Sequence, residues 1–209
     1  MSGEERATQV AGEERARGRS AVRPSATEGT GEELCDVLVC VDLQHVFADP
    51  GSDWGSPMFA DARARIAERV QAYGPDRTVF TRFVAPERPA GAWVAYYEQW
   101  PFALAPADGE LYALIPEYAG RPTVDEPTFG KWAPALQRAL GGARSVELVG
   151  VATDCCVIST ALPMSDAGVR VVVRADACAG STPQNHANAL DVMALYAPLI
   201  EVRGRRTSP

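Results

Sequence analysis

The stretch SVELVGVATDCCV (Ser145–Val157) contains an apolar run that leads directly into two adjacent cysteines. SVELVGV is rich in Val and Leu, which is typical of a strand buried on both faces of a parallel sheet. The chain then turns at Ala152–Thr153, and Thr153 or Asp154 can cap a helix that follows. The stretch therefore predicts a strand joined directly to a helix, the repeating unit of parallel sheets.

The same alternation of strand and helix patterns recurs along the chain. Further strands are predicted at 36–42, 77–84, 169–177 and 199–202, and helices at 59–73, 134–140, 154–167 and 183–196. The segment 85–132 is rich in Pro, Gly and aromatic residues and predicts only short regular pieces. These patterns predict an α/β fold with three α/β/α layers, in which helices cover both faces of a mainly parallel, doubly wound, Rossmann-like sheet.

The first 34 residues differ from the rest of the chain in composition. They contain almost no large apolar side chains, so we predict a disordered tail over 1–34 and one domain over 35–209. The net charge of −7 argues against a nucleic-acid partner, and no apolar stretch has the roughly 20 residues of a membrane span. Five cysteines, an odd and sparse set, indicate reduced thiols. We expect a cytoplasmic protein with neither nucleic acid nor membrane as a partner.

Residues that could perform chemistry follow two of the predicted strands. Asp42 ends the first strand, and Cys155 and Cys156 open the helix after the strand 145–151. Sites in parallel sheets form beyond the carboxyl ends of the strands. A thiol in the first turn of a helix is expected to have a lowered pKa, and the free N–H groups there can stabilise an oxyanion.

The two cysteines leave several alternatives open. Neighbouring residues on an α-helix point about 100° apart, so only one of Cys155 and Cys156 is expected to face a site. Either could instead be a small core residue, or the two could form a strained vicinal disulfide.

Lysine and arginine together number 20 in the chain, and Lys131 is the only lysine. A compact ammonium can sit beside a carboxylate in a tight site, whereas a guanidinium is a wide planar fork. Lys131 is therefore a candidate for a role that Arg cannot fill, and a chance surface charge is the alternative.

Three motifs together resemble those of a known family. The motifs are VDLQHVF (Val41–Phe47), FGKW (Phe129–Trp132) and GVATDCCVISTA (Gly150–Ala161), followed by DAGVRVVVRADA (Asp166–Ala177). In this order they are similar to the isochorismatase-like cysteine hydrolase family, which includes nicotinamidases and N-carbamoylsarcosine amidohydrolases. The resemblance covers about residues 35–203.

The resemblance implies a catalytic triad. It assigns Asp42 as the catalytic acid, Lys131 as the catalytic lysine and Cys156 as the nucleophile. In the T-D-x-C-V pattern, Cys155 occupies the variable position. The family also has a non-proline cis peptide, here Val151–Ala152, and the N–H groups of Ala152 and Cys156 would form the oxyanion hole.

The sequence departs from the family at the metal site. Many nicotinamidases bind a metal through a D-x-H…H cluster after the second strand, but TRFVAPERPAGAW (Thr81–Trp93) contains neither Asp nor His. The two histidines, His45 and His186, are far apart in sequence, and zinc normally needs three or four ligands. We therefore predict no metal and no cofactor, which argues against a nicotinamidase as such.

Aromatic residues between 54 and 132 are the candidates for substrate binding. They favour a flat or partly apolar amide, and the segment 93–104 is expected at the mouth of the site or at a subunit contact. Arg82 and Arg88 could bind a substrate carboxylate or be surface charges. The predicted substrate-binding residues are His45, Phe47, Trp93, Tyr97 and Trp132.

The expected function is that of a metal-independent cysteine amidohydrolase. It would hydrolyse a C–N bond of a small amide, ureido or lactam compound through a thioester. One alternative is an isochorismatase-type vinyl-ether hydrolase, and another is a non-catalytic scaffold that keeps the fold. The resemblance also implies a homo-dimer or a higher homo-oligomer.

Overall fold

The structure, a computed structural model, describes residues 33–205. Residues 1–32 of the predicted N-terminal tail lie outside this range, as do residues 206–209. The domain boundary placed at residue 35 stays a prediction. Within the described residues, every helix is too short or too polar to cross a membrane.

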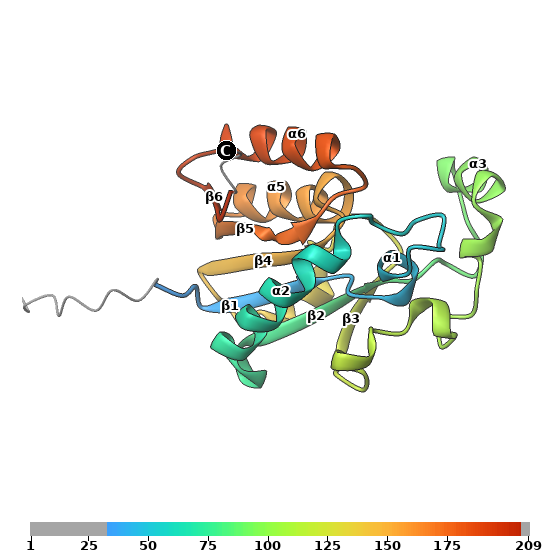
Figure 1. Cartoon of the computed structure of the whole chain (residues 1–209), viewed down its shortest axis with the longest axis horizontal. Coiled ribbons are helices and arrows are strands. Elements are labelled where there is room, and N and C mark those ends of the chain that lie inside the picture. The colour runs from blue at the N-terminus through green and yellow to red at the C-terminus, as the bar shows by residue number, and fades with distance from the viewer. Residues whose placement is uncertain (1–32, 206–209) are drawn as a thin grey trace, which may run out of the picture. The chain divides into compact units, whose positions relative to one another are not determined.

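Six strands form one sheet in which every neighbouring pair is parallel. The spatial order is β3-β2-β1-β4-β5-β6, so the chain begins in the middle, moves outward to one edge, and returns to build the other half (Figure 1). The strands are β1 (Val37–Val41), β2 (Thr78–Phe83), β3 (Thr123–Glu126), β4 (Ser145–Val151), β5 (Arg170–Ala179) and β6 (Ile200–Arg203). The order reverses between β1 and β4, where parallel sheets open a crevice at the carboxyl ends.

Helices cover both faces of the sheet. The helices are α1 (His45–Ala48), α2 (Phe59–Tyr73), α3 (Ala92–Gln99), α4 (Pro134–Ala139), α5 (Ile158–Asp166) and α6 (Pro183–Ala194). Helix α2 packs on one face, and α4, α5 and α6 pack on the other. The three-layer α/β/α fold with a parallel sheet is therefore confirmed.

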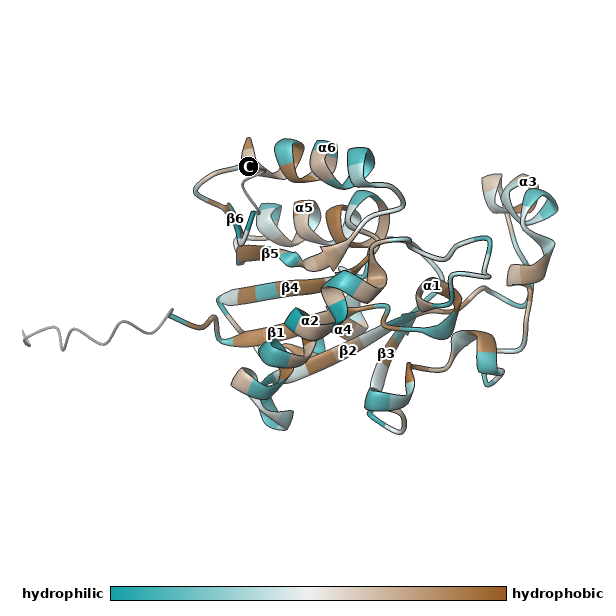
Figure 2. Ribbon diagram, viewed as in Figure 1, coloured by the Kyte–Doolittle hydropathy of each residue, from teal (hydrophilic) through white to brown (hydrophobic). Residues whose placement is uncertain are grey.

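Alternating side chains of β1 separate two buried clusters. Leu38 and Cys40 belong to the cluster that contains Ile66 of α2, whereas Val39 and Val41 belong to the other. That second cluster contains Leu136, Met164 and Met193, from α4, α5 and α6. Because both faces of the strand are buried, β1 is a continuous apolar run, and Figure 2 shows hydrophobic residues along the central strands.

Gly150 permits close approach of the two central strands. Its φ of +116° lies in a region that side-chain-bearing residues rarely adopt, and a Cβ there would lie 2.1 Å from the carbonyl oxygen of Val41. Only glycine fits both the dihedral angle and the space. The strand that leads to the two cysteines is thereby held tightly against the strand that leads to Asp42.

Some elements differ from those predicted. The helix expected over 154–167 begins with a π-helical turn, η5 (Thr153–Val157), before α5 starts. The segment 85–132 contains only short pieces, as predicted, and the longest are β3 at the sheet edge and the two-turn helix α3. Local propensity is a weak guide in such segments, because tertiary packing decides their conformation.

Candidate active site

The three residues predicted as a triad are brought together at the carboxyl edge of the sheet. Asp42 follows β1, Cys156 lies in the turn after β4, and Lys131 comes just before α4. All three side chains are buried. The Lys131 Nζ atom lies 3.1 Å from Oδ2 of Asp42, so the fold pairs the sole lysine with the carboxylate that ends the first strand.

The two carboxylate oxygens of Asp42 have different surroundings. Oδ1 accepts a 2.7 Å hydrogen bond from the Thr81 hydroxyl, which in turn accepts a 3.3 Å bond from the Asp42 N–H. Oδ2 faces the Lys131 ammonium and, within the described residues, accepts no hydrogen bond. Asp42 is also the one non-glycine residue of residues 33–205 with positive φ, at +53°. Thr81 therefore holds one oxygen by a hydrogen bond, and the Lys131 ammonium lies beside the other.

Lys131 is held by contacts along its whole length. Its ammonium donates a 2.8 Å hydrogen bond to the Thr128 carbonyl and lies 5.1 Å from the centre of the Phe83 ring. Its backbone N–H donates to the Thr160 hydroxyl at 2.9 Å, and that hydroxyl donates to the Cys156 carbonyl at 2.7 Å. Thr160 therefore ties the backbone of the lysine to that of the cysteine.

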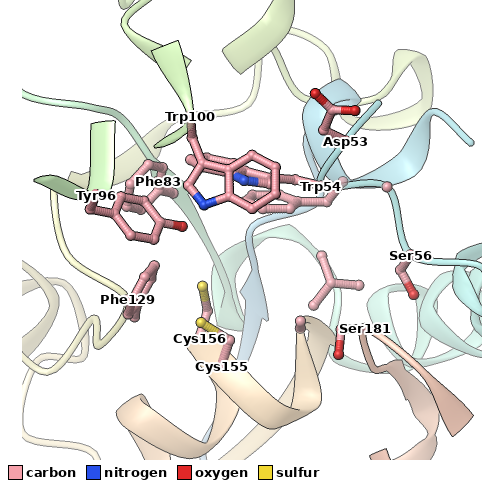
Figure 3. A pocket seen from close by; sticks show the side chains of 14 residues that line it. Asp53, Trp54, Ser56, Phe83, Tyr96, Trp100, Phe129, Cys155, Cys156 and Ser181 are labelled. Carbon is pink, nitrogen blue, oxygen red and sulfur yellow. The ribbon is translucent and has the colours of Figure 1, made fainter. Parts of the chain in front are cut away.

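Both adjacent cysteines line the same cavity, contrary to the prediction that only one would (Figure 3). The reason is the π-helical turn, in which the N–H groups of Cys155 and Val157 both bond the Ala152 carbonyl at 3.0 Å. A π turn is wider than an α turn, so successive side chains diverge less. Neither cysteine is in a disulfide, and the Val151–Ala152 peptide bond is cis.

The two thiols influence each other. A hydrogen bond with the Cys155 thiol raises the pKa of Cys156 well above its ordinary value, and burial and the Asp42 carboxylate raise it further. The same hydrogen bond lowers the pKa of Cys155. We expected the helix terminus to lower the pKa of this thiol. At Cys156 the neighbouring sulfur, burial and a nearby carboxylate outweigh that effect. The raised pKa favours the protonated form of the Cys156 thiol.

The turn that carries the cysteines is anchored from α6 and the loop before it. Neither Thr153 nor Asp154 caps the turn as predicted. Instead, the Asp154 carboxylate accepts hydrogen bonds from the N–H and hydroxyl of Ser181, at 2.8 and 2.6 Å. The Thr153 hydroxyl lies 2.8 Å from Nδ1 of His186. These contacts fix the orientation of the turn.

A cavity of about 260 Å³ opens above the cysteines. Six aromatic residues contribute to its lining, and we call them the aromatic cage: Phe47, Trp54, Phe83, Tyr96, Trp100 and Phe129. Figure 3 shows both sulfur atoms directed toward these rings. Asp42 and Lys131 are fully buried and are not among the residues that line the cavity. A ligand in the cavity would contact the sulfurs on one side and aromatic rings on the other.

The structure distributes the five predicted substrate-binding residues differently. Phe47 lines the cavity, whereas His45 lines a separate hollow beside Glu110. Trp93 packs 5.0 Å from Phe129, ring centre to ring centre, and thus supports the cage from behind. Tyr97 is buried and stacks on Trp93, and Trp132 packs against the cluster under α4, α5 and α6.

The sequence reasoning missed several residues of the site. Trp54, Tyr96 and Trp100 of the cage lie in the aromatic-rich region, which signalled their type but not their positions. The buried amide of Gln44 donates to the carbonyls of Phe83 and Tyr112, each at 2.9 Å. It thereby ties the end of β2 to the aromatic segment. Residues 33–205 contain no cluster of three or more His, Cys, Asp or Glu side chains placed to hold a metal ion.

Comparisons with known proteins agree with the fold. The family model for the isochorismatase domain matches residues 36–203. Isochorismatase domain-containing protein 2 of Rattus norvegicus is 29% identical over 132 residues, which cover 62% of this chain and 60% of that protein. The chain thus spans less than two thirds of that curated relative.

Solved structures with low sequence identity share the architecture. A cysteine hydrolase from Pseudomonas syringae pv. phaseolicola 1448A superimposes with a TM-score of 0.66 at 17% identity, covering 79% of this chain and 86% of that one. A nicotinamidase from Bacillus subtilis gives 0.63 at 20% identity, covering 81% and 99%.

Proposed function

The chain belongs to the isochorismatase family, and from this premise we propose that it is a metal-independent cysteine hydrolase of small amide, ureido or lactam compounds. The observation that carries the proposal is the buried Lys131–Asp42 pair, 3.1 Å apart, next to a cysteine whose sulfur faces a cavity. A base, a group that holds the base, and a nucleophile are the minimum set for this chemistry.

In the first step, Asp42 removes the thiol proton of Cys156. The raised pKa of Cys156 keeps the resting sulfur protonated, so a base beside it is required. Oδ2 of Asp42 is the proposed acceptor because Oδ1 is already engaged by Thr81. The thiolate then attacks the substrate carbonyl carbon, a C–S bond forms, and the carbonyl π electrons move to oxygen.

In the second step, the tetrahedral intermediate collapses. We assign its stabilisation to the backbone N–H groups of Ala152 and Cys156 in the turn after β4. The C–N bond breaks, Asp42 returns the proton to the departing nitrogen, and a thioester on Cys156 remains. Asp42 then removes a proton from water, the hydroxide attacks the thioester, and the acid leaves as Cys156 regains a proton.

Lys131 is proposed to act through Asp42. Its ammonium compensates the charge of the buried carboxylate and fixes the position of Oδ2. The hydrogen bond from the ammonium to the Thr128 carbonyl helps to hold it in place when Asp42 takes up a proton. We also propose that the protein forms a homo-dimer or a larger homo-oligomer. Light scattering of the purified protein tests this.

A screen for released ammonia over a panel of small amides, ureido compounds and lactams tests the proposal; ring-opened product is measured for the lactams. Wild type is compared with Cys156→Ala, and the acyl-enzyme is sought by mass spectrometry of the intact protein after rapid acid quenching. Turnover that disappears in Cys156→Ala, with a substrate-derived mass on wild type, supports the amidohydrolase. Vinyl-ether cleavage that survives in Cys156→Ala supports the ether hydrolase, and no turnover of either class supports a scaffold.

A further inference from the structure

We propose that the aromatic cage recognises a cationic group, so that the preferred substrates are small amides bearing a quaternary or protonated ammonium. This inference rests on the proposed function and adds the substrate class. It is carried by the combination of rings and charges that line the cavity.

Trp54 is the central residue of the aromatic cage. The ring centre of Trp54 lies 5.6 Å from that of Phe83, 5.9 Å from Tyr96 and 6.3 Å from Trp100. Aromatic faces carry a negative quadrupole, and tryptophan attracts cations most strongly. Several such rings around one small cavity are the arrangement that binds quaternary ammonium groups in water-excluded sites.

The lining of the cavity carries a single formal charge, although the Lys131 ammonium lies 5.1 Å from the ring centre of Phe83 in the cage. Asp53, beside Trp54, is the only residue of the lining with a formal charge at neutral pH, and Figure 3 shows its carboxylate on the side of the cavity away from the sulfurs. The candidate cation nearest in sequence to the cage, Arg82, is outside the lining and engages the Asp125 carboxylate through two nitrogens. Lys131 is buried against Asp42.

The two serine hydroxyls of the lining are already engaged. The Ser56 hydroxyl donates to the Gly180 carbonyl at 2.6 Å, and the Ser181 hydroxyl donates to Asp154 at 2.6 Å. A substrate carboxylate would find no cationic side chain in the lining, which is unfavourable in a largely apolar site. The cavity thus favours a positive group and disfavours a negative one.

The size of the cavity limits the substrate. About 260 Å³ lies below the range of roughly 300–1,000 Å³ typical of pockets for drug-sized ligands. The amide carbon must lie against Cys156, and the cage forms the opposite wall (Figure 3). The cationic group and the amide are therefore expected to be separated by only one or a few bonds.

A set of three similarly shaped primary amides tests the inference by binding. The cationic probe is (trimethylammonio)acetamide. The neutral probe is 3,3-dimethylbutanamide, in which carbon replaces the charged nitrogen, and the anionic probe is succinamate. Binding to full-length Cys156→Ala, which cannot form a thioester, is followed by calorimetry and by quenching of tryptophan fluorescence. We expect the cationic amide to bind about tenfold tighter than the neutral one, and succinamate to bind more weakly than either.

Single substitutions test which side chains cause the preference for the cationic amide. Asp53→Asn and Trp54→Leu, each in the Cys156→Ala background, are expected to reduce the cationic preference severalfold. Glu98→Gln removes an equal charge from an exposed position of α3 outside the lining and should leave the preference unchanged. Asp53 is exposed, so its variant is informative even if Trp54→Leu does not fold.

The outcomes separate this inference from the proposed function. Equal binding of the neutral and cationic amides, or tighter binding of succinamate, overturns the cage assignment even if wild type hydrolyses amides. Preferential cation binding supports the cage assignment. If the cationic amide binds preferentially but wild type hydrolyses no amide, the proposed function is wrong and the assignment of a cation site is still supported.

Discussion

The ammonium nitrogen of Lys131 lies 3.1 Å from Oδ2 of Asp42, and neither side chain is accessible to solvent. Burying one charge alone is costly, whereas a pair with further hydrogen bonds can be tolerated. Thr128 and Thr81 supply those further bonds, one on each partner. Each charge therefore depends on the other, which makes the pair sensitive to single substitutions.

Lys131→Met is expected to lower the free energy of unfolding by about 3–5 kcal/mol, because it leaves Asp42 buried and unpaired. It should also abolish hydrolysis. Urea unfolding and an ammonia assay measure the two effects. The double variant Lys131→Met with Asp42→Leu should recover much of the stability but none of the activity. Arg138→Gln, at an exposed position of α4, is the control and should change neither. A fully active Lys131→Met enzyme would contradict the assigned role.

Cys156→Ala is expected to lower kcat by at least about a thousandfold, because the covalent route is removed. Cys155→Ala should retain activity within about tenfold, although its sulfur also lines the cavity. Single-turnover kinetics on both variants make the comparison. A more severe loss in Cys155→Ala would reverse the assignment of the nucleophile. Iodoacetamide should label these two cysteines, which line the cavity, before Cys35, Cys40 and Cys178, which lie outside it.

Thr81→Val removes the hydroxyl that fixes Oδ1 of Asp42 while roughly keeping the shape of the side chain. The loss of this buried hydrogen bond should cost about 1–3 kcal/mol of stability. Because Thr81 lies outside the cavity lining, kcat is expected to fall and KM to stay nearly constant. Thr81→Ser should restore kcat. Equal changes in KM for both variants would show that Thr81 acts on the cavity instead.

Alkaline pH is expected to destabilise the fold. Burial raises the pKa of Cys40 and of Cys178, so the folded protein keeps two thiol protons that the unfolded chain releases above about pH 8.5. The stability that these protonated thiols contribute is fully present below that pH and declines as the pH rises above it. Urea unfolding at a series of pH values measures the slope. Cys178→Ala should make the slope shallower, and a stability that rises with pH would refute the assignment.

Gly150→Ala is expected to destabilise the protein by at least about 2 kcal/mol, because it adds backbone strain and a Cβ against the Val41 carbonyl. Gly120→Ala is the matched control. Its φ of +74° is also positive, but no atom lies within 4 Å of the added Cβ. It should cost only about 1 kcal/mol. Similar losses at both positions would mean that the close contact between β1 and β4 is unimportant.

The elements that could be predicted from the sequence are those with strong local signals. Helix α2 and strand β4 have the predicted bounds, because apolar side chains at helical spacing and a continuous apolar run mark them locally. Strand β3 was not predicted, since TVDE is short and only half-buried at the edge of the sheet. The π-helical turn was not predicted either, because the sequence around Cys155 has no feature that distinguishes it from an α turn.

For the site, residue types were predictable and contacts were not. The pairing of Asp42 with Lys131 was expected from the resemblance and from the rule that sites lie at the carboxyl edge. The roles of Thr81 and Thr160 depend on hydrogen bonds between residues distant in sequence, for which an isolated threonine gives no signal. The cage likewise depends on how a long irregular segment packs over the cysteines, which local sequence does not encode.

The all-parallel sheet has a consequence for biogenesis. Neighbouring strands in it cannot be joined by a tight hairpin, and Asp36 and Ser145, which bond across the two central strands, are 109 positions apart in the chain. Contacts that span such distances form slowly during folding. Asp42 emerges from the ribosome before Lys131 and Cys156, so an incomplete nascent chain lacks part of the site. The complete site and the finished tertiary structure therefore arise together.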